Sequence, residues 1–241
     1  MNKRALGMMV ASVLACATAT AVPVANLKIN GDIKPPTCTV NGGEQADLIY
    51  NLGAVSPSLI HQSKGYNALP GAKNNLTVDC DAATYLTFKA TDNYLNPFIQ
   101  VASMNSSKKS STFNLVDASS ADKTVGGVSY RWESVEADGA TVYISRANDG
   151  TDDVAYTDGR QLVRGATNGW TKTQQKYVEP SELNLVSAKT FSTDIYTFNG
   201  IIENWSGTYI LPKDELDKQG VDISNGVDYT SNVTLTFNFG I

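Results

Sequence analysis

The chain has 241 residues, with 24 acidic and 19 basic side chains and a formal net charge of −5 at pH 7. An acidic chain without a basic cluster is a poor candidate for binding nucleic acid or an anionic membrane. Neither a Pro- or Ser-rich linker nor an internal repeat divides the sequence, so we expect one large domain with long loops.

The first 21 residues predict a secretory signal peptide. Lys3 and Arg4 precede a run of apolar and small residues that is too short for a comfortable membrane span and ends in small-residue cleavage sites. We expect cleavage after Ala21, or alternatively after Ala19, which would export the protein through the inner membrane. Cys16 leaves a second possibility open, because it follows Val-Leu-Ala as in bacterial lipoproteins that are cut and lipidated at such a cysteine.

Residues 24–33 alternate in polarity and predict a strand with one apolar face. Pro35 and Pro36 end this strand, since proline cannot donate to a ladder. Gly31 leaves a gap on the apolar face where another backbone could come close. That face carries Ala25, Leu27, Ile29, Gly31 and Ile33.

Two cysteines remain once the signal peptide is removed, Cys38 and Cys80. Disulfides persist in the compartments to which exported proteins go, so we expect these two residues to be bridged. In the chain-entropy model a bridge of this span stabilises the fold by about 4 kcal/mol. The alternative is a pair of free buried thiols.

The middle of the chain shows many short alternating runs separated by turn signals and no sustained helical period. This pattern predicts an all-β sandwich. We expect a bulge near Ala82–Ala83, a hairpin turn at Ala137–Gly139, a polar loop over 148–168 and a single helical turn over Leu211–Leu216. The expected strands are Thr37–Val40, Asp47–Leu52, Asn75–Ala90, Phe98–Met104, Phe113–Val116, Val125–Val135, Thr141–Ser145 and Ala188–Ile202.

The clearest alternation covers residues 232–241 and predicts a half-buried strand. A terminal segment this apolar needs a partner beside it. Its apolar face carries Val233, Leu235, Phe237, Phe239 and Ile241.

Motifs for catalysis or cofactor binding are absent from the sequence, so we expect no catalytic residue, no metal and no cofactor. His61 is the only histidine, and zinc or triad chemistry needs more partners than it has. The carboxylates of 148–153 could hold Ca²⁺ but lack the spacing of an EF-hand loop.

One alternative function stays open, a secreted carbohydrate-binding β-sandwich module or glycosidase-like protein. It would use an acidic pair, Glu133 and Glu136, or exposed tryptophans. A spacing of three along a strand is expected to put the two glutamates on opposite faces. The candidate tryptophans are Trp132, Trp170 and Trp205.

The segment Leu27–Val40 resembles the start of a mature chaperone–usher pilin, which has an alternating extension, a glycine near its end and then the first cysteine. Cys80 falls where the second pilin cysteine would, and the C-terminal strand, with Phe239 and with Gly226 ahead of it, is similar to the pilin C-terminal signature. Gly240 departs from that signature, which has an aromatic residue in the penultimate place.

Further segments resemble the β-fimbrial major-subunit type of fimbrial-like secreted proteins. These are Asp79–Ala82, Phe88–Asn93, and Gly126–Gly127 through Gly139. The resemblance covers nearly all of 22–241 and is weakest from 148 to 187.

The resemblance implies a structural subunit with an incomplete immunoglobulin-like sandwich over 35–241 and a donor-strand extension over 22–34. A periplasmic chaperone would first lend the missing strand, and at the outer-membrane usher the extension of the next fimbrial subunit would replace it. The subunit would thus pass from the periplasm into a cell-surface fimbrium; any receptor stays open. The donor residues would be Leu27, Ile29, Gly31 and Ile33, and the acceptor residues Val233, Leu235, Phe237 and Phe239.

Overall fold

The computed structural model describes residues 27–29, 34–101, 106–150, 157–199 and 207–239. The chain divides into two units, residues 1–34 and 35–241. In the first unit, Leu27 and Ile29 are almost fully exposed and lie outside any regular element. The expected signal peptide, Gly31 and Ile33 lie outside the described residues.

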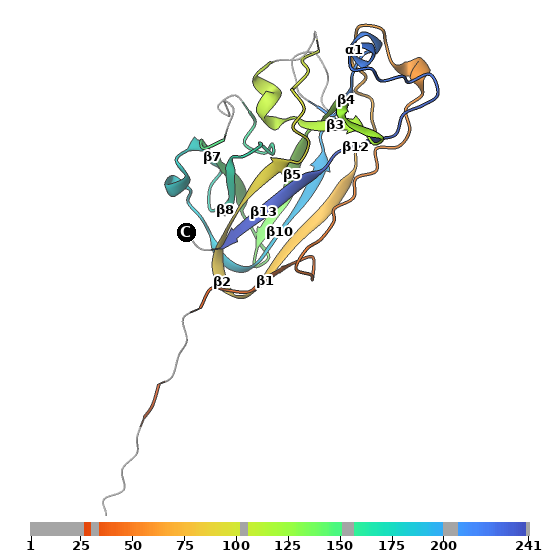
Figure 1. Cartoon of the computed structure of the whole chain (residues 1–241). Helices are drawn as coiled ribbons and strands as arrows, with labels where there is room; N and C mark the ends of the chain where they lie inside the picture. Colours follow the sequence, from red (N-terminus) through yellow and green to blue (C-terminus); the bar gives the residue numbers. More distant parts are fainter. Residues whose placement is uncertain (1–26, 30–33, 102–105, 151–156, 200–206, 240–241) are drawn as a thin grey trace, which may run out of the picture. The chain divides into compact units, whose positions relative to one another are not determined.

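The second unit is almost entirely β and sandwich-like, which confirms the predicted all-β sandwich. The described strands form one sheet of nine and a second of four, and Figure 1 shows both as curled layers. Short 3₁₀ turns cover Pro57–Leu59, Ser106–Ser111 and Pro180–Glu182, and α1 covers Lys213–Lys218. The strands are β1 (Cys38–Val40), β2 (Lys73–Asp92), β3 (Phe113–Asp117), β4 (Ser120–Val128), β5 (Tyr130–Ala137), β6 (Ala140–Thr141), β7 (Tyr143–Ala147), β8 (Thr167–Thr171), β9 (Lys176–Val178), β10 (Ser187–Thr197), β11 (Tyr209–Ile210), β12 (Tyr229–Thr230) and β13 (Val233–Phe239).

The 20-residue strand β2 links the parts of the larger sheet. Its first half pairs with β1 and β10, and its second half pairs with β8 and β13. The register against β10 shifts between Ala188 and Thr190, which face Thr84 and Asp79 of β2. On β2 this irregularity lies between Asp79 and Thr84, the stretch that contains the bulge predicted near Ala82–Ala83.

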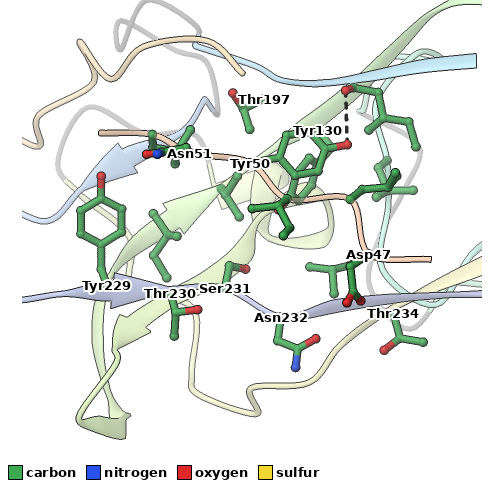
Figure 2. Close-up of a pocket in the computed structure, with 18 of the residues that line it drawn as sticks. Asp47, Tyr50, Asn51, Tyr130, Thr197, Tyr229, Thr230, Ser231, Asn232 and Thr234 are labelled. Atoms are coloured by element: carbon green, nitrogen blue, oxygen red, sulfur yellow. Dashed lines mark hydrogen bonds between the residues drawn. The ribbon is translucent and has the colours of Figure 1, made fainter. Parts of the chain in front are cut away.

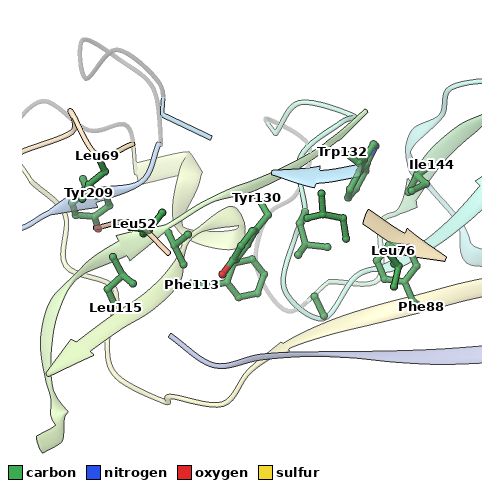
Figure 3. Packing of buried hydrophobic residues seen from close by; sticks show 14 of the residues in the cluster. Leu52, Leu69, Leu76, Phe88, Phe113, Leu115, Tyr130, Trp132, Ile144 and Tyr209 are labelled. Carbon is green, nitrogen blue, oxygen red and sulfur yellow. The ribbon is translucent and has the colours of Figure 1, made fainter. Parts of the chain in front are cut away.

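The core lies between the two sheets (Figure 3). β2, β5 and β10 of the larger sheet contribute inward side chains, and β3, β4 and β11 of the smaller sheet contribute others. Phe88 is fully buried, and its ring centroid lies 5.5 Å from that of Trp170 and 6.4 Å from that of Trp132. Both tryptophans are buried. Trp132 and Trp170 are therefore core residues and offer no exposed stacking surface, while Trp205 lies outside the described residues.

The predicted turn at Ala137–Gly139 is confirmed. Asp138 and Gly139 both have positive φ, 48° and 75°, the conformation of a two-residue hairpin turn, and they join β5 to β6. The flanking strands are shorter than expected. The predicted strand 125–135 is divided into the end of β4 and most of β5, and these two strands lie in different sheets. The predicted strand 141–145 is divided between β6 and β7, and β7 pairs with β8 and not with β5.

Two predicted strands are wrong. Residues 47–52 form no strand, and neither do residues 98–101, while 102–105 lie outside the described residues. The loop before β3 is fixed by side-chain bonds instead of a ladder, because the Asn114 amide donates to the carbonyls of Tyr94 and Asn96. The predicted helical turn is present as α1, which begins directly after Pro212.

Candidate functional site

The strand β13 forms a free edge of the larger sheet. It pairs antiparallel with β2, from Val233 opposite Asp92 to Phe239 opposite Leu86, and among the described residues β2 is its only partner strand. Val233, Leu235 and Phe237 are only half-buried, and Phe239 is 40% exposed. The predicted half-buried strand is confirmed, and its apolar face is incompletely covered.

A groove of about 1810 Å³ runs beside this edge (Figure 2). One rim is the stretch from Ile223 to Phe239, and the other is the segment 44–55. Its floor consists of side chains that belong to the core between the sheets. These are Leu76, Leu115, Val125, Val128, Tyr130, Leu162, Ile195 and Ile210. The groove therefore opens directly onto the hydrophobic core.

The rim opposite β13 is an extended segment without a ladder. Leu48 and Tyr50 are half-buried and Leu52 is buried, while Ile49 and Asn51 between them are exposed. This alternation is strand-like and explains the sequence prediction, yet within the described residues no strand pairs with 46–52. A strand needs hydrogen-bonded neighbours as well as alternating side chains, and the groove lies where a neighbour would be.

A few side-chain bonds hold this rim in place. The Tyr50 hydroxyl donates to the Ile195 carbonyl over 3.2 Å (Figure 2), and the Asn74 amide donates to the Ile49 carbonyl over 2.8 Å. Near one end of the groove, the Tyr229 hydroxyl donates to the Gly53 carbonyl over 2.7 Å. The rim thus keeps its position without backbone pairing to a strand.

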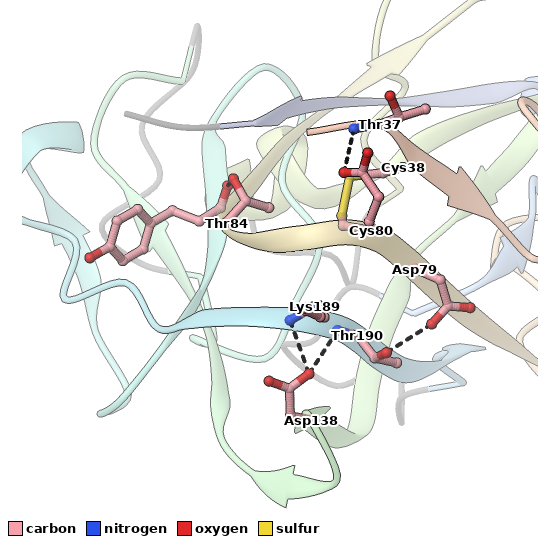
Figure 4. Close-up of a disulfide and its surroundings, with 10 residues drawn as sticks. Thr37, Cys38, Asp79, Cys80, Thr84, Asp138, Lys189 and Thr190 are labelled. Atoms are coloured by element: carbon pink, nitrogen blue, oxygen red, sulfur yellow. Dashed lines mark hydrogen bonds between the residues drawn. A yellow bond between two sulfur atoms is a disulfide. The ribbon is translucent and has the colours of Figure 1, made fainter. Parts of the chain in front are cut away.

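The disulfide lies at the other end of the groove. Cys38 and Cys80 are bonded, which confirms the predicted bridge, and they face each other across β1 and β2 (Figure 4). Cys38 and Val40 line the groove. The bridge therefore anchors the start of the rim to the long strand β2.

The charged side chains that line the groove are all acidic: Glu44, Asp47 and Asp228. Tyr130 lies on the floor, where burial raises its pKa to about 12, so its hydroxyl stays protonated at neutral pH. An apolar floor with neutral hydroxyls and acidic rims suits an extended apolar segment that carries positive charge on its polar side.

The acidic pair considered from the sequence lies on β5. Glu133 forms an ion pair with Lys73, with 3.2 Å between Glu133 Oε1 and Lys73 Nζ. Ser134 has a φ of 51° and interrupts the register of β5, so Glu133 and Glu136 are both exposed on one side of the strand. The expectation that they lie on opposite faces is wrong, because this bulge shifts the alternation by one residue.

The carboxylate cluster at 148–153 is only partly described. Asp149 accepts from Lys89 Nζ over 2.9 Å and from the Thr167 backbone N–H over 2.8 Å. Burial acts to raise the pKa of Asp149, but these hydrogen bonds outweigh it and the pKa is lowered. Its oxygens thus have protein partners already, and Asp152 and Asp153 lie outside the described residues.

No protein-family model matches this chain, and no curated protein matches it. In the described part of the chain, none of the helices is both long and apolar enough to span a bilayer. The sequence reasoning missed Tyr50, Tyr130 and Tyr229 as groove residues. The alternation of 48–52 was a usable signal for Tyr50, but Tyr130 and Tyr229 reach the groove only through the folding of distant strands.

Proposed function

We propose that this protein is a structural subunit of a cell-surface fimbria that polymerises by donor-strand exchange. The observation that supports this most is the groove along β13, where a free strand edge and an open path to the core coincide. An extended peptide added at such an edge gains main-chain hydrogen bonds, and its alternate side chains fill the space below.

The segment 24–33 has the side-chain pattern and the length expected of a strand that binds in such a groove. It alternates in polarity, and its apolar side chains Leu27 and Ile29 are exposed in the structure. Its polar face carries one positive and one negative charge, Lys28 and Asp32, so the apolar face and not the charge supports the match. Its ten residues extend over about 33 Å, comparable to the 11 residues from Tyr229 to Phe239 that border the groove.

The energy of the joint is substantial. Burying Leu27, Ile29 and Ile33 is worth roughly 1.5–3 kcal/mol each, on the order of 5–9 kcal/mol before ordering costs. That is comparable to the stability of a whole domain. A subunit without a donor is expected to be weakly stable, so it requires a periplasmic chaperone after export and hands its groove to the next subunit at an outer-membrane usher.

The test is a synthetic peptide of residues 22–34 added to purified subunit that lacks this segment. We expect the melting temperature to rise with peptide concentration, because a ligand that binds only the folded state stabilises it. The matched control is the same peptide with Gly31→Leu, whose side chain would meet the acceptor backbone and which should leave the melting temperature unchanged.

A truncated subunit that is already stable and indifferent to both peptides would overturn the proposal. The sandwich would then be complete without a donor, and a carbohydrate-binding module would be the better interpretation.

A further inference from the structure

The strand β1 ends at Val40, although its partner strand continues. Val40 lies opposite Val78 in a regular antiparallel register, and β2 extends back to Lys73. The backbone N–H of Asn41 still donates to the Thr77 carbonyl over 2.8 Å, as the next ladder position requires. The ladder then stops, and the cause lies in the side chain of Asn41.

The side-chain amide of Asn41 takes the place of a peptide group in this ladder. Its Oδ1 accepts from the Thr77 N–H over 2.7 Å, where a continuing strand would offer the Asn41 carbonyl. Its Nδ2 donates to the Asn75 carbonyl over 3.1 Å, where a continuing strand would offer the Gly43 N–H. One asparagine can do both because its side chain carries an acceptor oxygen and an NH₂ donor. The edge of β2 is thus satisfied at these two residues without further backbone.

The backbone that follows turns away from the sheet. Asn41 and Gly42 have positive φ, 47° and 82°, a region in which asparagine is enriched among non-glycine residues. Gly43 donates to the Val40 carbonyl over 3.0 Å and accepts from the Val40 N–H over 2.7 Å, so the chain bonds back on itself. The rim segment 44–55 follows directly. The chain therefore leaves β2 where this rim begins.

Farther along, side chains connect the rim to the larger sheet. The Asn74 amide of β2 donates to the Ile49 carbonyl, and the Tyr50 hydroxyl donates to the Ile195 carbonyl of β10. Because each bond is made by a side chain, the rim backbone does not lie against these strands as a ladder neighbour would. The inward residues Leu76 of β2 and Ile195 of β10 line the groove together with Tyr50. The groove thus depends on the rim staying off the ladder.

We infer that Asn41 is a positioning residue of the groove, because its side chain completes the edge of β2, ends β1 and directs residues 44–55 away from the sheet. Without that side chain, the Thr77 N–H and the Asn75 carbonyl would be open to the backbone of 42–47, and the rim would lose its fixed start. The inference rests on the proposed function, in which the groove binds an extended strand. Asn41 is not among the described residues that line the groove, so it acts on binding only through the rim.

A second turn offers a matched control. Asp138 also has a positive φ, 48°, and precedes a glycine. Its Oδ1 accepts from the backbone N–H groups of Lys189 and Thr190 over 3.0 and 2.8 Å (Figure 4). Asn41 and Asp138 are both exposed, and each side chain forms two hydrogen bonds to the backbone of a neighbouring strand. The chain after Asp138, however, enters the short strand β6, which does not line the groove.

The test compares Asn41→Gly with Asp138→Gly in the subunit that lacks residues 22–34. This subunit retains every described strand and the described core, which begin at Cys38. Glycine adopts positive φ without strain, so each change removes two side-chain hydrogen bonds and keeps the turn. We expect both variants to lower the melting temperature by a similar amount, about 2–4 °C.

Only Asn41→Gly should weaken binding of the 22–34 peptide, measured by titration calorimetry. The Kd should rise about tenfold, because the peptide must then order the rim as it binds. Asp138→Gly should bind the peptide as the unsubstituted subunit does. Asn41→Asp keeps an oxygen that can accept from the Thr77 N–H and should recover part of the affinity.

An unchanged peptide affinity in Asn41→Gly would overturn the inference. An equal loss of affinity in both glycine variants would overturn it as well, because the effect would then follow from lower stability. A peptide that does not bind the unsubstituted subunit would refute the proposed function and this inference together. If the peptide binds the unsubstituted subunit and Asn41→Gly equally well, the proposed function stands and only the role of Asn41 is refuted.

Discussion

The two strands β2 and β13 are paired neighbours with very different inner faces. On β2 the inward residues Leu76, Val78, Leu86 and Phe88 are at most 2% exposed. On β13 the corresponding residues are half-buried, and Phe239 is 40% exposed. Both strands alternate equally well in sequence.

The difference arises from their neighbours. At Val78 and at Phe88, β2 pairs with two strands, β1 and β10 at the first and β8 and β13 at the second, whereas among the described strands β13 pairs with β2 alone and borders the groove. The side chains of β13 therefore contribute less to the free subunit than their sequence suggests. Under the proposed function, a partner strand would cover the rest of their surface.

The largest expected effect on stability comes from substituting two aromatic residues that are in contact, one on β2 and one on β13. Phe88 and Phe237 have centroids 5.8 Å apart, but only Phe88 is fully buried. We expect Phe88→Ala to cost about 3–5 kcal/mol and Phe237→Ala about 1–2 kcal/mol in urea unfolding of the subunit lacking 22–34. With the 22–34 peptide bound, the cost at Phe237 should increase and that at Phe88 should not. If the two variants lose the same free energy of unfolding without peptide, the proposed difference between β2 and β13 is contradicted.

The second prediction concerns the disulfide that holds the groove rim to β2. Cys80→Ser should lower the free energy of unfolding by about 2–5 kcal/mol and reduce the amount of exported protein. Because the bridge lies at the groove, peptide binding should weaken as well. Non-reducing peptide mapping of the wild type provides the check, and free thiols at Cys38 and Cys80 in exported protein would refute the assignment.

The smallest expected effect lies on the opposite, paired edge of β2. The lowered pKa of Asp149 means that its carboxylate stabilises the fold above the unfolded pKa of about 4, and that this contribution is lost as the pH falls through the lower, folded value. Asp149→Asn should cost about 1 kcal/mol at pH 7. The difference from wild type should vanish at low pH in urea titrations, and a difference that persists there would exclude the carboxylate as its source.

Much of the fold could be predicted from local patterns. The long strand β2 with its bulge, the turn at Asp138–Gly139 and the alternating β13 each follow from side-chain periodicity or from residues that tolerate positive φ. The Cys38–Cys80 bridge followed from the expected compartment. These features depend mainly on neighbouring residues, so the sequence determines them directly.

The tertiary structure decided what the local pattern leaves open. Residues 48–52 alternate like a strand, yet among the described residues no strand pairs with them. A ladder depends on what lies beside the segment as well as on its own sequence. Glu133 and Glu136 share a side because of a single bulge at Ser134. The groove itself is built from residues as distant as Val40, Tyr130 and Tyr229. Periodicity in a sequence determines which face of a strand is apolar, but only packing determines whether that face is covered.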